Sequence, residues 1–374
     1  MRFPQALALV LLAGCLGLSA CTAGPHATSS AKPPAVAETA SPMQQPPTPI
    51  QSPSPTSTET PTGTATPLPQ VTLEAVGDIM LGRTVGQMVL DKGPQSIFAG
   101  VQSALDDADV LVGNLECTIT DRSQPVQKSF DLKAPPQAAQ ALYLAGFDLV
   151  SQANNHAMDF GAGGLADTQK TLGQYGIATV GAGVNNAVAN APVFITRNGL
   201  RMAFLAFVDV PPERSGFDPH SWAASASTPG VAWGDPDQIK ADVQAAKLQA
   251  DVVIVLLHSG IEIADYFPPI STNQRLDAHT AIDAGAALVI GAHPHVLEQI
   301  ERYHGGLIAY SLGNFVFDDW KGPANATIIL RVKLGPTGVL SYDYLPVLID
   351  NGLPHLITDK DVPAIATMVA PPKQ

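Results

Sequence analysis

The stretch Val289-Ile290-Gly291-Ala292-His293-Pro294-His295, read with the apolar residues before it, decides the fold. Residues 286–290 have the composition of a buried strand, and the strand ends in a turn of small residues that carries two imidazoles. Neutral imidazole is a common metal ligand, and Pro294 restricts the backbone between the two rings. One His-x-His is a weak signal alone, so its weight depends on how the other strands end.

Other apolar runs are also followed by side chains that bind metals. The runs at 71–76, 109–112, 147–151 and 251–257 lead into Asp78, Glu116, Asn155 with His156, and His258. Taken singly, Asp78 could cap a helix and His156 could be a buried histidine in an Asn-rich turn. A carboxylate directly after a buried strand is costly unless it is paired or bound to metal. Structural roles would need a separate explanation for each residue, so we interpret them as one constellation.

The mixture of ligands indicates the kind of metal. Carboxylate and amide oxygens combined with imidazoles suit Mn, Fe or Zn better than Ca or Mg. The sequence therefore predicts one or two divalent transition-metal ions, and two ions bridged by a carboxylate would activate a water and hold an anionic substrate. Cys117 adjoins Glu116 and could be a further ligand, although a small buried residue is the favoured interpretation.

Apolar periodicity predicts an α/β domain. We expect helices at 95–108, 136–145, 165–175, 236–249 and 272–284. We expect strands at the runs above and at 177–180, 193–196, 202–208 and 308–315, with a final antiparallel pair at 326–334 and 339–348. Asn198-Gly199 predicts a hairpin turn. Residues 211–234 lack periodicity and are either a lid over the site or an irregular surface loop.

The first 69 residues are not expected to belong to this domain. Residues 1–21 have one early positive charge and an apolar run too short to span a membrane. Leu18-Ser19-Ala20-Cys21 resembles the lipobox of bacterial lipoproteins, which predicts lipidation at Cys21 and an extracytoplasmic protein anchored to the bacterial cell membrane. An ordinary secretory signal is the alternative. Residues 22–69 are rich in Pro, Ser, Thr and Ala and predict a disordered tether.

The remaining chain has the size and charge of a single acidic domain. Residues 70–353 can bury a sizeable core, and 354–374 are expected to form a peripheral tail. Lys plus Arg number 20 against 33 Asp plus Glu, a net charge of −13, which argues against nucleic acid as a partner. A polyanionic partner would need a metal or a local basic patch. Of the three cysteines only Cys117 lies in the domain, which excludes an internal disulfide there.

The motifs, in order, resemble one family. They are Gly-Asp-x-Met at 77–80, Asn-Leu-Glu at 114–116, Asn-Asn-His at 154–156, the strand-end His258, Gly-x-His-Pro-His at 291–295 and Tyr-Ser-Leu-Gly-Asn-Phe-x-Phe at 310–317. This set, within residues 71–348, resembles the CapA family of capsule (poly-γ-glutamate) synthesis proteins, which is related to the calcineurin-like metallophosphoesterases. The resemblance implies an α/β fold of the metallo-dependent phosphatase type, a four-layer α/β/β/α sandwich with two mixed β-sheets flanked by helices.

The resemblance also implies roles for individual residues. Asp78 and His295 would hold one metal, Glu116 would bridge, and Asn155, His258 and His293 would complete the second site. His156 would assist the leaving group, so His156 and Asp78 are the catalytic candidates. Apart from the resemblance, Arg83, Lys128 and Lys133 are the basic residues nearest the motif loops for an anionic polymer, and the substrate-binding candidates are Arg83, Asn114, Lys133 and Asn314. Met80 stands where phosphoesterases usually have a histidine ligand, and Ser259 stands where the family commonly has tryptophan.

Three functions are compatible with these features. The first is a lipid-anchored extracytoplasmic protein in synthesis, processing or export of poly-γ-glutamate or a similar anionic capsule polymer, acting by metal-dependent hydrolysis or transfer. The second is a catalytically idle, polymer-binding or scaffold component of a membrane export complex, which Met80 favours. The third is a general extracytoplasmic phosphoesterase.

Overall fold

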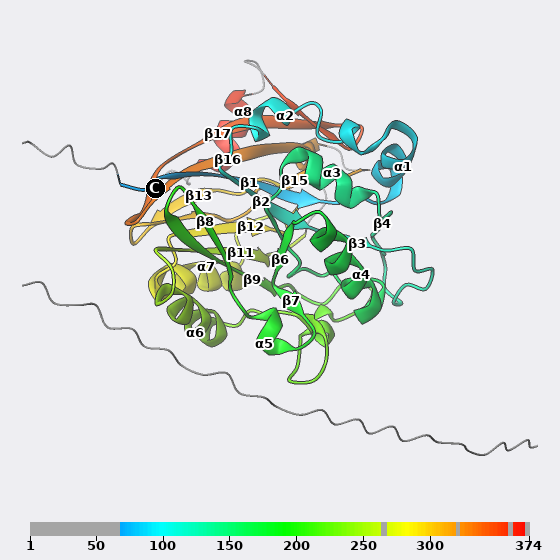
Figure 1. Cartoon of the computed structure of the whole chain (residues 1–374), viewed down its shortest axis with the longest axis horizontal. Coiled ribbons are helices and arrows are strands. Elements are labelled where there is room, and N and C mark those ends of the chain that lie inside the picture. The colour runs from blue at the N-terminus through cyan, green and yellow to red at the C-terminus, as the bar shows by residue number, and fades with distance from the viewer. Residues whose placement is uncertain (1–67, 263–267, 319–321, 358–361, 371–374) are drawn as a thin grey trace, which may run out of the picture. The chain divides into compact units, whose positions relative to one another are not determined.

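The computed structural model describes residues 68–262, 268–318, 322–357 and 362–370, and these form two facing β-sheets with helices outside them (Figure 1). The predicted signal sequence at 1–21, the predicted lipidation site Cys21 and nearly all of the predicted tether at 22–69 lie outside the described residues. Within the described ranges, no helix combines the length and apolar character needed to cross a membrane.

The first sheet has eight strands, ordered β18-β17-β16-β1-β2-β5-β6, with β15 also paired to β1. Its parallel part consists of β1 (Val71–Ile79), β2 (Val110–Leu115), β5 (Leu149–Ser151), β6 (Ala178–Val180) and β15 (Asn314–Val316). Its antiparallel part consists of β16 (Ala326–Gly335), β17 (Gly338–Asp350) and β18 (Leu353–Leu356). The sheet is therefore mixed.

The second sheet has six strands, ordered β13-β14-β12-β11-β9-β8. Its parallel strands are β9 (Leu200–Asp209), β11 (Val252–Ser259), β12 (Leu288–Ala292) and β14 (Gly306–Ala309). The antiparallel edge strands are β8 (Val193–Arg197) and β13 (Ile300–Tyr303). β8 and β9 form the predicted hairpin, in which Asn198 and Gly199 both have positive φ, as a two-residue type I′ turn requires.

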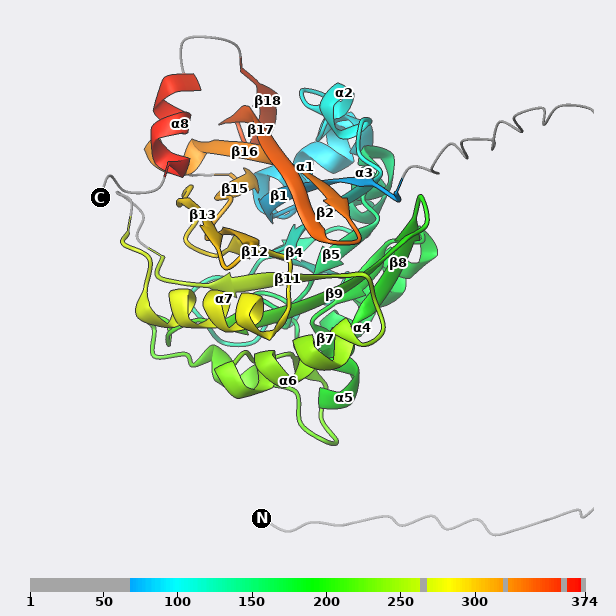
Figure 2. The same ribbon diagram turned by 90° about the vertical axis from the view of Figure 1, so that its left-hand side faces the viewer.

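Alternation along the strands builds the layers. In β11, Ile254 and its even-numbered neighbours join the core between the sheets, while Val255 and the odd-numbered residues pack against α6 (Pro236–Lys247) and α7 (Thr272–Ala284). Figure 2 shows these two helices along the outer side of the second sheet. The outer side of the first sheet packs against α1 (Arg83–Lys92), α2 (Gln102–Leu105) and α3 (Ala138–Ala145). The predicted four-layer α/β/β/α sandwich is confirmed.

The remaining elements are one long helix and several short segments. They are α4 (Gly161–Gln174), α5 (Asn186–Ala189), the 3-10 turns η1 (Pro94–Ser96), η2 (Pro219–Trp222) and η3 (Gly322–Asn325), and two small two-stranded pairs, β3 (Thr118–Ile119) with β4 (Lys133–Ala134) and β7 (Ala182–Gly183) with β10 (Gly230–Val231). Residues 211–234 thus contain η2 and β10, and β10 pairs with the chain after β6.

Two parts of the chain differ from the sequence expectation. The helix predicted over 95–108 is only η1 and the single turn α2, because the chain bends where Gly100 meets β18: a Cβ there would lie 2.5 Å from the Pro354 carbonyl oxygen. Within 354–374, where a peripheral tail was expected, β18 extends the first sheet. α8 (Val362–Val369) places Ile365 and Val369 in the core between the sheets.

Replacing Leu73 with alanine tests how much the core between the two sheets contributes to stability. Leu73 is fully buried between the sheets, so Leu73→Ala should lower the free energy of unfolding by about 2–5 kcal/mol. The matched control is Leu248→Ala, because Leu248 is 88% exposed, and it should change stability by less than about 0.5 kcal/mol. Urea unfolding midpoints measure both. Equal losses would contradict the assignment of the core.

Candidate metal centre

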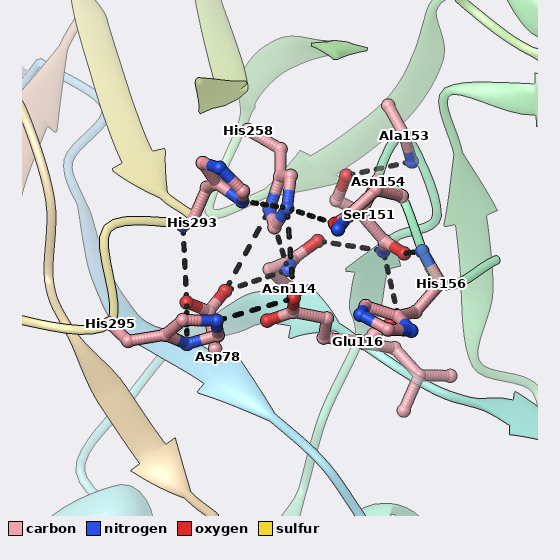
Figure 3. A network of polar contacts seen from close by, with 12 residues as sticks. Asp78, Asn114, Glu116, Ser151, Ala153, Asn154, His156, His258, His293 and His295 are labelled. Atoms are coloured by element: carbon pink, nitrogen blue, oxygen red, sulfur yellow. Dashed lines mark hydrogen bonds and ion pairs between the residues drawn. The ribbon is translucent and has the colours of Figure 1, made fainter. Parts of the chain in front are cut away.

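The structure brings all six predicted metal ligands together where parallel strands of both sheets end. Figure 3 labels five of them, all except Asn155. Asp78 lies at the end of β1 and His258 at the end of β11. Glu116 follows β2, and Asn155 follows β5. His293 and His295 follow β12 and complete the set. All six side chains are buried.

The charged ligands and imidazoles divide into two groups that share Glu116. One group contains Glu116, His258 and His293, and the other contains Asp78, Glu116 and His295; within each, the ligand atoms lie within 4.8 Å of one another. The Asn155 Oδ1 lies 2.9 Å from His258 Nε2, which places the amide oxygen beside the first group. This division matches the one that the resemblance implies, while the roles themselves stay predictions.

Strained backbone presents the two imidazoles of the His-Pro-His turn. His293 and His295 have φ values of 98° and 60°, which side-chain-bearing residues rarely adopt and which cost about 1–3 kcal/mol each. The backbone N–H of His293 donates to Asp78 Oδ2 at 3.1 Å, so the turn is bound to the end of β1. Gly291 permits close packing just before the turn, since a Cβ there would lie 1.8 Å from the Tyr310 carbonyl oxygen.

The two carboxylates differ in how well they are satisfied. Asp78 accepts hydrogen bonds from Asn114 Nδ2 at 2.7 Å and from the His293 N–H. Both oxygens of Glu116 are buried and have no hydrogen-bond partner among the described residues. Burial raises the pKa of Glu116 well above its ordinary value, and the neighbouring Asp78 raises it further. Burial also raises the pKa of Asp78. A buried carboxylate with no donor is unfavourable unless a cation completes it.

The imidazoles of His258 and His293 are held in the neutral form that binds metals. His258 Nε2 lies 3.1 Å from His293 Nδ1, and burial lowers the pKa of both rings well below the usual histidine value. His295 Nδ1 lies 2.8 Å from Asn314 Oδ1, so the amide oxygen can accept the Nδ1–H, which leaves the lone pair on Nε2, 3.7 Å from Glu116 Oε1. The side chains present therefore fit a divalent transition-metal ion.

His156 lies beside the centre with a carboxylate partner that the sequence analysis missed. His156 Nδ1 is 2.7 Å from Asp159 Oδ2, and burial lowers the pKa of His156 although Asp159 opposes the shift. Asn154 accepts the backbone N–H of His156 at 3.0 Å and donates to Asn114 Oδ1 at 3.1 Å. The spacing of three residues between His156 and Asp159 within one turn was the available signal.

The four predicted substrate-binding residues fall into two pairs. Asn114 and Asn314 are buried in the centre, where their amides hold Asp78, His258 and His295 in place. Arg83 is partly exposed, lies 3.8 Å from Asp318 and has its guanidinium over the Phe130 ring. Lys133 is exposed, donates to the Arg122 carbonyl at 3.3 Å and lies over Phe160. Only Arg83 and Lys133 are placed at the surface.

Two sulfur-containing side chains lie outside both ligand groups. Met80 is fully buried in the core on the helical side of the first sheet, and its sulfur accepts the Gly82 N–H at 3.1 Å. The Cys117 sulfur accepts the Leu81 N–H at 3.5 Å, and burial raises the pKa of this thiol to about 12. Cys117 is therefore a protonated, buried core residue.

Comparison with known proteins identifies the family. The model of the bacterial capsule synthesis protein PGA_cap matches residues 72–319. The chain belongs to the PGA_cap family. The PGA biosynthesis protein CapA of Bacillus subtilis is 36% identical over 282 residues, covering 75% of this chain and 72% of that protein. The capsule biosynthesis protein CapA of Bacillus anthracis is 33% identical over 297 residues, covering 77% and 70%.

More distant relatives and solved structures extend the comparison. A probable polyglutamine synthesis accessory protein of Mycobacterium tuberculosis is 35% identical over 223 residues, covering 57% of each chain. The calcineurin-like phosphoesterase YfkN of Bacillus subtilis aligns with a TM-score of 0.44 at 16% identity, covering 75% of this chain and 91% of that chain. A putative 5'-nucleotidase of Staphylococcus aureus aligns with a TM-score of 0.48 at 13% identity, covering 80% and 57%.

Glu116→Gln should change how stability depends on pH in chelator-treated protein. Because burial raises the pKa of Glu116 above its ordinary 4.5, the folded state holds this proton more tightly than the unfolded state. The contribution of Glu116 to stability therefore falls as the pH rises above about 4.5. The free energy of unfolding of the variant, minus that of the parent, should rise between about pH 5 and pH 8.

Urea unfolding in the presence of chelator measures this difference at each pH. Leu248→Ala, which changes an exposed residue and no titratable group, serves as the control, with a difference that stays flat across the same range. A flat difference for Glu116→Gln as well would contradict the unpaired, buried state of that carboxyl.

Proposed function

We propose that this PGA_cap protein acts in the synthesis, processing or export of poly-γ-glutamate or a similar anionic capsule polymer, by metal-dependent hydrolysis or transfer at the centre described above. The observation that carries the chemistry is the buried Glu116 carboxylate, which has no donor among the described residues and belongs to both ligand groups. The polymer follows from the family and from relatives named for PGA and capsule biosynthesis.

The residues divide the work as follows. Asp78, Glu116 and His295 would hold one cation, and Glu116, Asn155, His258 and His293 would hold another. A bound Mn, Fe or Zn ion polarises an oxygen of the substrate and lowers the pKa of a bound water. Asn114 and Asn314 keep the ligands oriented through their amide groups.

His156 is the residue proposed to move a proton. When Nδ1–H donates to Asp159, the neutral ring carries its lone pair on Nε2, where it can accept a proton and later return it to a leaving group. The Asp159 carboxylate would stabilise the imidazolium formed in this step. The lowered pKa of His156 keeps the ring neutral before the reaction.

Substrate charge and cellular location belong to the same proposal. Arg83 and Lys133 are exposed cations at the starts of α1 and β4, so they are the groups proposed to contact an anionic polymer. Cys21 would carry the lipid that anchors the protein on the outer side of the bacterial cell membrane, beside a polymer synthesis or export complex.

A polymer-binding scaffold without catalysis is the second candidate, and Met80 favours it. Met80 is a buried apolar residue at the position where the resemblance expects a metal-binding histidine. A missing ligand would weaken the site formed by Asp78 and His295. The family also includes relatives described as accessory proteins, which fits a supporting role.

The metal content of the protein purified without chelator is the first test. At least one equivalent of Mn, Fe or Zn is expected, and His293→Ala should lose most of it because His293 belongs to a ligand group. His304→Ala, which removes an exposed histidine of a surface ion pair, should keep the full content. A parent protein with no bound metal, and no affinity for added Mn or Zn, would contradict the metal centre.

Complementation in cells that lack the gene separates catalysis from scaffolding. If the centre is catalytic, Asp78→Asn and His293→Ala should reduce released polymer to less than about one tenth of the wild-type amount at equal protein level. The surface variant His304→Ala should restore it fully. Full restoration by both centre variants would support the scaffold instead.

A further inference from the structure

A lysine with a buried side chain lies beside the candidate centre and has three polar partners. Lys128, on the loop between β3 and β4, has a side chain that is 0% exposed. Its Nζ donates to the Asn155 carbonyl at 2.5 Å and lies 3.1 Å from Asp159 Oδ1 and 2.9 Å from Glu213 Oε1. The ammonium thus makes one hydrogen bond and two ion pairs inside the protein. Lys128 is therefore not available to a polymer at the surface.

Two of the three partners belong to the centre. The Asn155 backbone receives the ammonium, while its side-chain oxygen lies 2.9 Å from His258 Nε2. Asp159 receives the ammonium on one oxygen and contacts His156 Nδ1 with the other. The Lys128 ammonium thus contacts both Asn155, a predicted metal ligand, and Asp159, the carboxylate that orients His156.

The third partner belongs to the segment 211–222, which the sequence analysis left open between a lid and a surface loop. The Glu213 N–H donates to the Phe217 carbonyl at 2.8 Å, which closes a tight turn around the carboxylate. The rings of Phe217 and Trp222 pack against each other at 4.9 Å and lie 5.4 and 4.9 Å from Lys128 Nζ. Segment 211–222 therefore contacts the Lys128 ammonium through the Glu213 carboxylate and through the rings of Phe217 and Trp222.

We propose that Lys128 is a positioning residue of the metal centre: it fastens segment 211–222 to the centre, and its own contacts to the Asn155 carbonyl and Asp159 set the positions of Asn155 and His156. The proposal rests on the proposed function for its chemistry. Its structural half, the attachment of the segment, is independent of any metal. Glu213 and Lys128 can be altered separately, so the two halves can be tested apart.

Glu213→Gln tests the attachment. The substitution removes the charge on the segment side and leaves the Lys128 contacts to Asn155 and Asp159 in place. Arg214 is exposed next to Glu213, so loosening of the segment should speed tryptic cleavage after Arg214 at least tenfold. Asp237→Asn, the same chemical change at the exposed start of α6, should cleave at the parent rate. Equal cleavage rates in parent and Glu213→Gln would overturn the proposal.

Lys128→Met tests the positioning. It keeps the length of the apolar stem and removes the three donors, so the Kd for Mn or Zn should rise at least tenfold, while Glu213→Gln stays within about threefold. The His156 ring N–H resonance should shift in Lys128→Met and stay in Asp237→Asn. A folded Lys128→Met with parental metal affinity and an unchanged His156 signal would overturn the positioning role.

The design separates this proposal from the proposed function. If Lys128→Met does not fold, cleavage after Arg214 in Glu213→Gln decides. If the parent protein binds no metal, the proposed function fails, whereas the cleavage rate and the His156 resonance still decide whether Lys128 attaches the segment and orients that ring.

Discussion

The structure depends on a buried carboxyl group that the protein's own hydrogen bonds do not satisfy. Glu116 lies between the sheets beside Asp78, and neither of its oxygens has a donor among the described residues. His258, whose Nε2 lies 3.8 Å from Glu116 Oε1, supplies no positive charge, because burial lowers its pKa and keeps the ring neutral. Such an arrangement destabilises the fold unless a cation is present. Hydrophobic packing between the two sheets must therefore offset the unfavourable free energy of burying Glu116 at the strand ends.

Two asparagines hold the closely packed carboxylates and imidazoles of the centre in place. Asn114 and Asn314 each offer both a donor and an acceptor without adding charge, so each can hold a carboxylate or an imidazole on one side and the protein on the other. Charged residues in these positions would alter the balance between the two carboxylates and the cation. The charge of the centre thus lies on the carboxylates, and the amides of Asn114 and Asn314 orient the side chains around them.

The sequence predicted the ligands better than their supports. Asp78, Glu116 and His258 follow apolar runs that can form only buried strands, and the ends of parallel strands gather at one edge without further information. Asp159 and Lys128 could not be found in this way, because their contacts arise when loops distant in the chain approach each other. The broken helix at 95–108 has the same cause, since its bend depends on β18. The predictions for residues 1–69 remain predictions.

The ligands come from strands between β1 and the turn after β12, so no short piece of the chain contains a working half of the centre. Closing such long loops is slow, and the site exists only once both sheets have assembled. Metal affinity in proteins follows the same general order for many ligand sets, which leaves the choice of ion to the supply at the moment of assembly. An ion bound at this centre would thus be selected by the metals available where the chain finishes folding.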